Sequence, residues 1–188
     1  MKKQPKIAII SASIRKGRNS HRVALFFRNY LLANNMGEAE ILDLKAYNFP
    51  LFEERLHLLK EPDKKAITFG DKVRKCDGII VVTPEYNGGY PASLKNAIDL
   101  LYDEWHRKPV AIATVSDGDF AGTQVITSLQ FSFWKMRALL VPARFNVAKV
   151  QEHFSDEGIP DNESVYNKRA SGFVGELLWL IEACEKMK

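Results

Sequence analysis

The sequence has few of the residues and patterns that mark specialised protein classes. Only two of its 188 residues are cysteines, Cys76 and Cys184, and they are too far apart to form a CxxC pair or a disulfide framework. This usage predicts a reducing compartment, so we expect a cytoplasmic protein. No stretch approaches the roughly 18 apolar residues of a transmembrane helix. The four apolar residues before Ser11 are too few for a signal peptide.

Several signatures of chemistry are missing as well. The chain has no GxxxxGK[ST] phosphate loop, no GxGxxG and no GxSxG. Its histidines, His21, His57, His106 and His153, have no metal-ligand spacing, so we interpret each as a surface residue and expect no metal site. The net charge of +4 mildly favours anionic ligands. Its basic residues form no stripe, which argues against nucleic-acid binding.

What the sequence does contain is a regular alternation of short apolar runs and amphipathic segments. We expect strands at 6–11, 40–44, 78–82, 109–115 and 139–144, and helices at about 20–35, 62–75, 91–102, 123–136 and 162–186. Ser20 is the expected N-cap of the first helix. The alternation predicts one α/β domain over 1–188, with a parallel sheet covered on both faces. Right-handed crossovers and one reversal of direction give the strand order 2-1-3-4-5.

The most informative stretch is 83–99, TPEYNGGYPASLKNAID. It follows a buried strand, and ligands of open α/β sheets bind in loops at the carboxyl ends of strands. Pro84 is rigid, Tyr86 supplies a ring face, and Asn87 supplies both a donor and an acceptor. Gly88 and Gly89 let backbone amides come close. This loop predicts a flat, polar aromatic ligand; a turn whose tyrosines fill a subunit interface is the alternative.

Two further loops are predicted at the same edge of the sheet. In the first, Ser13 and Ser20 offer hydroxyl groups and Arg15 a planar fork that matches phosphate oxygens. Amides at the start of the following helix add partial positive charge, which predicts a phosphate site. The loop around Ser116 and Gly118 would close the far side of a ligand. Each loop alone is equally compatible with a solvated connection or an ordinary turn.

These residues together resemble the NAD(P)H-dependent FMN reductase family, which has a flavodoxin-like fold and includes quinone, azo-dye and chromate reductases. The resemblance rests on Ser13-Ile14-Arg15-Lys16-Gly17 with Ser20, on Thr83-Pro84-Glu85-Tyr86-Asn87, and on Pro91 with Leu94-Lys95-Asn96-Ala97-Ile98-Asp99. It covers the chain from Lys6 to about Arg144 and is weaker in the last helix. The fold that it implies is a three-layer sandwich.

The resemblance also implies roles for individual residues. Ser13, Arg15 and Ser20 would hold the phosphate of FMN; Pro84, Glu85, Tyr86 and Asn87 would line the isoalloxazine; Ser116 and Gly118 would close one side. The family's usual serine three positions after the arginine is Arg18 here, so Asn19 or Ser20 would take that contact. A homodimer or homotetramer is implied, with the flavin near the subunit interface.

The implied function is transfer of electrons from NADPH or NADH through FMN to a quinone, an azo compound or free flavin. The flavin would perform the chemistry, and we expect no catalytic acid or base from the protein. The acidic Asp117-Gly118-Asp119 leaves the choice between NADH and NADPH open. One alternative is a flavin-binding electron carrier without NAD(P)H turnover. A receiver-type signalling domain is disfavoured, because Ile10-Ser11-Ala12 stands where its acidic pair would be.

Overall fold

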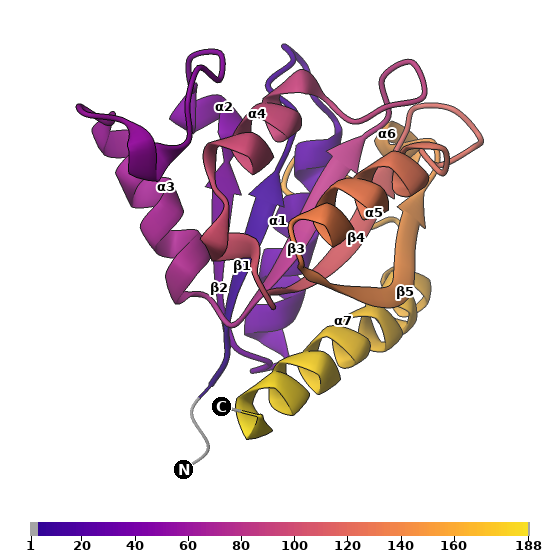
Figure 1. Ribbon diagram of the computed structural model, residues 1–188. Coiled ribbons are helices and arrows are strands. Elements are labelled where there is room, and N and C mark those ends of the chain that lie inside the picture. Colours follow the sequence, from indigo (N-terminus) through magenta and orange to yellow (C-terminus); the bar gives the residue numbers. More distant parts are fainter. Residues whose placement is uncertain (1–3, 188) are drawn as a thin grey trace.

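A parallel sheet forms the middle layer of the protein, described here by a computed structural model that covers residues 4–187 (Figure 1). Its strands are β1 (Lys6–Ser11), β2 (Glu38–Asp43), β3 (Gly78–Pro84), β4 (Pro109–Val115) and β5 (Leu139–Val147). They pair in the order β2-β1-β3-β4-β5, and every pairing is parallel. The predicted fold class and strand order are therefore confirmed.

Helices cover both faces of the sheet (Figure 1). One face carries α1 (Ser20–Ala33) and α7 (Glu163–Lys186), and the other carries α3 (Lys64–Lys75), α4 (Ala92–Leu100) and α5 (Val125–Lys135). Short helical segments lie in the connections: α2 (Leu44–Tyr47), η1 (Leu56–Leu58), η2 (Asp103–Trp105) and α6 (Val150–His153). Within the described residues, none of these helices combines the length and apolarity that crossing a membrane requires.

Alternate residues of each central strand feed the two halves of the core. In β1, Ile7 and Ile9 pack with residues of α1 and α7, whereas Ala8 and Ile10 pack with residues of α3 and α4. Successive side chains of a strand point to opposite faces, so a strand covered on both faces must be apolar at nearly every position. This requirement explains the uninterrupted apolar runs in the sequence.

The ends of several elements differ from the sequence prediction. Ser20 is not the N-cap of α1, because Asn19 occupies that position and Ser20 is the first helical residue. The third predicted helix ends at Leu100 rather than near 102. The edge strand β5 continues to Val147, past a register irregularity that contains Pro142. Proline lacks the N–H that a ladder needs, so it is tolerated in an edge strand at such a bulge.

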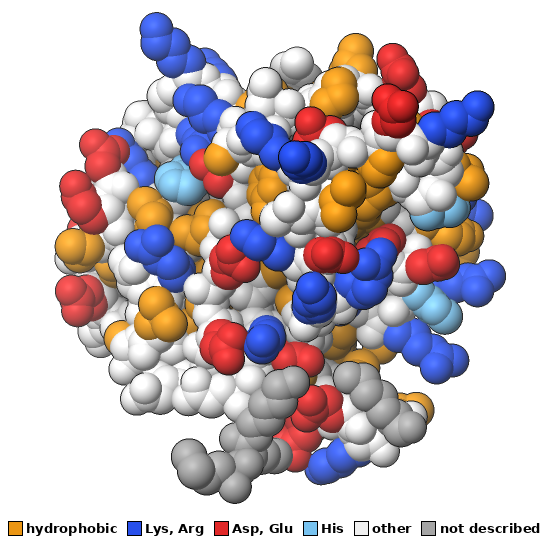
Figure 2. Space-filling model, turned by 90° about the vertical axis from the view of Figure 1, so that its left-hand side faces the viewer, with side chains coloured by type: hydrophobic (Ala, Val, Ile, Leu, Met, Phe, Trp, Pro, Cys, Tyr) orange, Lys and Arg blue, Asp and Glu red, His pale blue; other side chains and the backbone are white. Residues whose placement is uncertain are grey.

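The connection between β2 and α3 is apolar for a loop, and part of it packs on the core. Tyr47 and Phe49 stack on one another and both contact the ring of Phe69 in α3. Leu51 remains 84% exposed. The side of the molecule that carries α3 shows basic and acidic side chains interspersed, with apolar ones between them (Figure 2). On this side, no large surface of one charge appears.

Candidate functional site

The loops that follow β1, β3 and β4 meet at the carboxyl edge of the sheet, at the top of Figure 1. They enclose a pocket of about 260 Å³. Of the predicted site residues, those that line it are Ser13, Arg15, Asn19, Ser20, Pro84, Glu85, Tyr86, Ser116 and Gly118. Asn87 is the predicted residue that does not. Three segments far apart in sequence thus form one site, because β1, β3 and β4 are neighbours in the sheet.

The first loop is fixed by an ion pair that the sequence did not reveal. The guanidinium of Arg18 donates to both carboxylate oxygens of Asp43 at the end of β2, and also to the backbone oxygen of Ser13 at 2.7 Å. Burial raises the pKa of Asp43, but the hydrogen bonds from Arg18 and from the backbone N–H of Lys45, together with the positive charge of Arg18, outweigh that effect and hold the pKa below its usual range. Arg18 therefore organises the loop, while Arg15 stays exposed with a guanidinium that has no partner among residues 4–187.

Ser20 lies at the floor of the pocket, in the first turn of α1. Ser20 is 4% exposed, and its Oγ is the one buried side-chain polar atom without a hydrogen-bond partner among the described residues. A buried hydroxyl left unpaired costs about 1–3 kcal/mol. The helix has no acidic residue of its own in its first turn, so its free amides keep their partial positive charge. An anion is the ligand that this arrangement suits best.

Asn19 bridges two of the loops. Its side-chain amide donates to the carboxylate of Asp117 and to the side-chain oxygen of Gln151, both at 3.2 Å. The donor of Asn19 is thereby shared with the third loop and with α6. The side-chain donor of Asn19 is thus already in use, whereas the hydroxyl of Ser20 at the start of the helix is not.

Tyr86 ties the second loop to the first. Its hydroxyl lies 2.7 Å from the Oγ of Ser13. Beyond it the chain reverses between Tyr86 and Gly89, which exchange two backbone hydrogen bonds. Asn87 and Gly88 have φ angles of 52° and 79°, the left-handed values that a type I′ turn needs at both central positions. Asn87 therefore sits exposed at the tip of this turn, away from the pocket.

Glu85 has a structural task. Its carboxylate accepts the backbone N–H groups of Gln124 at 2.9 Å and Val125 at 3.3 Å, at the start of α5. Glu85 thus caps the start of α5, because the side chain of the N-cap residue, Gln124, makes no such hydrogen bond.

The third loop closes the pocket with its backbone. Ser116 donates from Oγ to the backbone oxygen of Gly118 at 2.7 Å, which holds the turn in shape. Asp119 pairs with Lys149 at 2.9 Å, whereas Asp117 lines the pocket with a carboxylate that accepts a hydrogen bond from the neutral Asn19 amide. The acidic character noted in the sequence therefore reaches the pocket through Asp117 alone.

Behind the first loop lies His21, for which the prediction of a surface residue was wrong. It is half-buried, and its Nδ1 lies 2.9 Å from the Oγ of buried Ser11. Burial and the neighbouring positive charge of Arg18 lower the pKa of His21. The ring therefore stays neutral near pH 7, and its hydrogen bond to Ser11 joins the start of α1 to the end of β1. Spacing within the sequence could not show this contact, because Ser11 belongs to the sheet and His21 to α1.

With this geometry established, comparison with known proteins is informative. A sequence model described as NADPH-dependent FMN reductase matches residues 5–152. The chain belongs to this family. It is accordingly an oxidoreductase that uses FMN and a nicotinamide cofactor. The NAD(P)H-dependent FMN reductase LOT6 of Saccharomyces cerevisiae is 34% identical over 138 residues, which are 66% of this chain and 71% of that protein.

Two further similarities agree. A quinone reductase of Pseudomonas putida is 32% identical over 121 residues, 62% of either chain. Among solved structures, the flavoenzyme NAD(P)H:(acceptor) oxidoreductase FerB of Paracoccus denitrificans superposes with a TM-score of 0.76. It covers 95% of this chain and 98% of its own, at 21% identity, and so supports the fold alone.

The residues of the pocket fit FMN. The unpaired hydroxyl of Ser20, the free guanidinium of Arg15 and the uncompensated start of α1 suit a phosphate. Pro84 and Tyr86 supply a rigid, partly apolar edge for a ring system. No group of three His, Cys, Asp or Glu side chains within residues 4–187 is placed to hold a metal ion.

Proposed function

We propose that the pocket at the carboxyl edge of the sheet binds FMN, and that electrons from NADPH or NADH pass through it to a small acceptor such as a quinone, an azo compound or free flavin. The observation that carries the proposal is the buried, unpaired Oγ of Ser20, which shares its pocket with Arg15 and Tyr86. Such a hydroxyl needs an acceptor, and a phosphate oxygen provides one.

Each loop has its own task in this proposal. Ser20 donates to the phosphate from Oγ, Arg15 adds a charge-assisted contact from above, and the amides of the first turn of α1 add partial positive charge. Ser13 keeps Tyr86 in place through their mutual hydrogen bond. Pro84, Glu85 and Tyr86 line the isoalloxazine, and the Ser116–Gly118 turn closes one side. Asn87 is left with a role in shaping the turn.

FMN, when bound, supplies the redox chemistry, taking a hydride equivalent from the nicotinamide and giving electrons to the acceptor. The protein positions the partners and leaves one side of the pocket open to them. Among the residues that line the pocket, Asp117 bears on the choice of nicotinamide, because its carboxylate would repel the additional phosphate of NADPH. We therefore propose that NADH is the better of the two reductants.

Steady-state oxidation of NADH and NADPH, with FMN and a quinone added, tests this function. An enzyme consumes nicotinamide in proportion to time and quinone, and the rate depends on FMN. The alternative, a flavin-binding electron carrier, would bind FMN and show no turnover with either nicotinamide. Flavin binding without turnover would thus contradict the proposed oxidoreductase, and absence of flavin binding would contradict both.

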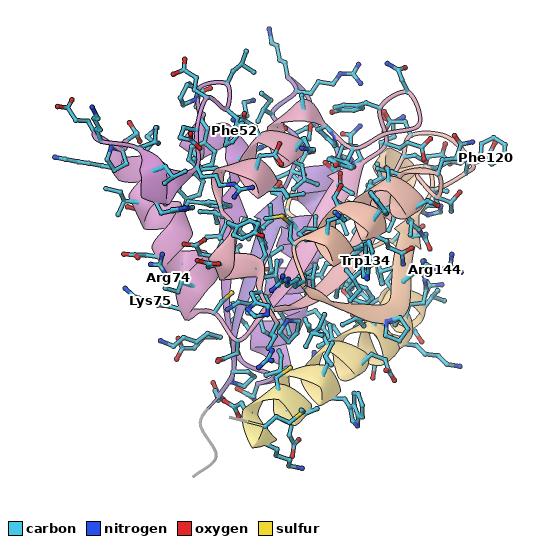
Figure 3. The ribbon with its side chains drawn as sticks, in the orientation of Figure 1. Phe52, Arg74, Lys75, Phe120, Trp134 and Arg144 are labelled. Atoms are coloured by element: carbon cyan, nitrogen blue, oxygen red, sulfur yellow. The ribbon has the colours of Figure 1, made fainter. Side chains whose placement is uncertain are left out.

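A homodimer or homotetramer remains our proposal for the assembly. Support comes from Phe131 and Trp134 on α5, which are 62% and 64% exposed with ring centroids 5.7 Å apart. Phe52 and Leu51 of the segment next to α4 are also exposed, and Figure 3 shows Phe52 and Trp134 on elements that cover the same face of the sheet. Large apolar groups left in water mark interaction surfaces.

Light scattering on the eluting protein tests the assembly. The wild type should have at least twice the mass of one chain, and Trp134→Glu should reduce it to one. A monomeric wild type would refute the proposal. The cytoplasmic location also remains a proposal, supported by the two free cysteines.

A further inference from the structure

A second pocket, of about 640 Å³, lies at the amino edge of the sheet. It is lined by the end of α3, the segment that leads into β4, the start of β5 and the end of α7. The strand β3 separates it from the FMN pocket; its seven residues span about 20 Å at 3.3 Å per residue. Its volume falls within the range of about 300–1,000 Å³ typical of small-molecule sites. The function proposed above does not use it.

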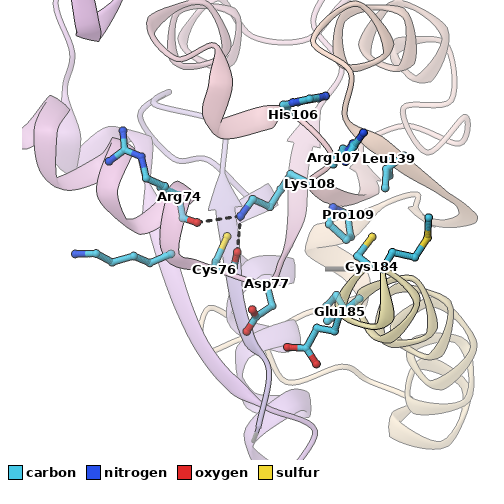
Figure 4. Close-up of a pocket in the computed structure, with 13 residues that line it drawn as sticks. Arg74, Cys76, Asp77, His106, Arg107, Lys108, Pro109, Leu139, Cys184 and Glu185 are labelled. Carbon is cyan, nitrogen blue, oxygen red and sulfur yellow. Dashed lines mark hydrogen bonds between the residues drawn. The ribbon is translucent and has the colours of Figure 1, made fainter.

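The polar side of this pocket is positively charged. Figure 4 shows His106, Arg107 and Lys108 along one side of it. The guanidinium of Arg107 has no hydrogen bond or ion pair within residues 4–187, and Lys75, at the end of α3, has only a 3.9 Å contact with Asp71. Arg74 is different, because Asp71 and Glu104 already neutralise it.

Lys108 is the most informative of these groups. It is half-buried, and its ammonium donates to the backbone oxygens of Arg74 and Cys76 (Figure 4). Both partners are neutral, and an ammonium has three protons to donate. One donor therefore remains for a ligand, and the positive charge is offset only by the partial negative charge at the C-terminal end of α3. Partly buried charges are costly unless they find a counter-charge.

Two carboxylates also line the pocket, on the opposite side from the bases in Figure 4. Asp77 already accepts the backbone N–H of Lys6 at 2.7 Å. Glu185 is exposed, in the last turns of α7. The apolar groups Pro109, Leu139 and Ile181 line the pocket as well. The pocket thus combines apolar surface with basic groups.

We propose that this pocket binds a small anionic amphiphile, an aromatic or aliphatic body that carries one sulfonate, carboxylate or phosphate group. The body lies against Pro109, Leu139 and Ile181, the anionic group meets Arg107 and Lys108, and Lys75 adds positive charge at the rim. An uncharged molecule of the same shape leaves the basic groups without a counter-charge and binds less well.

Cys184 provides a direct probe of occupancy. It lines the pocket and is half-buried, so a maleimide can reach it. Cys76 lines the same pocket but is buried, and its burial raises the pKa of the thiol to about 11, so it stays unreactive near pH 7. The rate of alkylation of one residue, followed by mass spectrometry, therefore reports on this pocket alone.

The test uses the FMN-saturated protein and the probe 8-anilinonaphthalene-1-sulfonate, with affinity measured by calorimetry. We expect the saturating probe to slow alkylation of Cys184 by N-ethylmaleimide. Its uncharged analogue N-phenyl-1-naphthylamine should bind at least about tenfold more weakly, as loss of a charge-assisted contact implies. Replacing both cations of the rim, Lys75→Glu with Arg107→Glu, should weaken the sulfonate by a similar factor.

Lys168→Glu is the control for reversal of charge outside the pocket. It makes half the charge change of the double variant, on the exposed face of α7, about 24 Å along the helix from Cys184. It should leave binding unchanged, and none of these variants should alter the affinity for FMN. Unprotected Cys184, equal binding of the uncharged analogue, or equal affinity in the double variant and the control would each overturn the proposal.

Discussion

Replacing Ser20 by alanine should have opposite effects on the flavin-free and the flavin-bound protein. In the flavin-free protein the Oγ of Ser20 is buried without a partner, and such a group costs about 1–3 kcal/mol. Its removal should raise the free energy of unfolding by about 1 kcal/mol, and the higher helix propensity of alanine adds a few tenths. In the complex the same hydroxyl donates to a charged phosphate, a contact of about 1.5–3 kcal/mol. FMN should therefore bind at least about tenfold more weakly.

Two measurements on the same preparation decide the matter. Urea unfolding of the flavin-free variant gives the first change, and quenching of FMN fluorescence on titration gives the second. Riboflavin, which lacks the phosphate, should bind wild type and variant equally. A variant that is less stable without flavin and binds FMN as tightly as the wild type would refute the assignment of Ser20 to the phosphate.

Ser13→Ala is the matched control. The Oγ of Ser13 is already bonded to the hydroxyl of Tyr86 and accepts the backbone N–H of Arg15. Its loss should lower the stability of the flavin-free protein by about 0.5–1.5 kcal/mol, the net worth of a typical hydrogen bond. The two serines are seven residues apart, so opposite signs in their stability effects would show that burial and pairing, rather than loss of a hydroxyl in this loop, are responsible.

Four further predictions concern the loops around the pocket. Arg15→Ala should weaken FMN by about 1–3 kcal/mol while leaving stability nearly unchanged, since its guanidinium is free; equal flavin content in purified variant and wild type would contradict this. Glu85→Ala should lower the free energy of unfolding by about 0.5–2 kcal/mol through loss of the cap, whereas Glu85→Gln retains an acceptor and should cost less; equal urea midpoints for both would exclude the capping role. Asp117→Asn should shift preference towards NADPH, seen as a fall in the ratio of kcat/KM for NADH to that for NADPH; an unchanged ratio would remove Asp117 from this role. The lowered pKa of Asp43 means that its pair with Arg18 stabilises the protein fully above about pH 3.9, the pKa in the unfolded state, and less as the pH falls through the pKa in the folded state. The free energies of unfolding of wild type and Asp43→Asn should therefore differ near pH 6 and converge in strong acid. A constant difference over this range would count against the stabilising role of the pair.

The sheet was predictable because burial on both faces leaves little choice of residue. Lys6–Ser11, Gly78–Pro84 and Pro109–Val115 are central strands, and their apolar runs are confirmed almost residue for residue. The ends of edge elements were harder. In β5 the ladder survives a bulge at Pro142 because one side of an edge strand has no partner, a tolerance that composition does not reveal.

The pocket was predictable to the extent that it depends on the order of the strands. Once β1, β3 and β4 are neighbours, the loops after them must meet. Contacts across the chain were not predictable. Arg18 reaches Asp43, and Glu85 reaches the start of α5, over separations of 25 and 39 residues. No local spacing encodes such pairs, so the sequence showed Arg18 only as a departure from the family pattern.

A crystal structure of the protein with FMN would show whether this pocket holds the phosphate. We expect the phosphate at the start of α1, with one oxygen within hydrogen-bond distance of the Oγ of Ser20 and another near the guanidinium of Arg15, and with the ring along Pro84 and Tyr86. A phosphate bound elsewhere on the protein, or a Ser20 hydroxyl still without a partner in the complex, would contradict it.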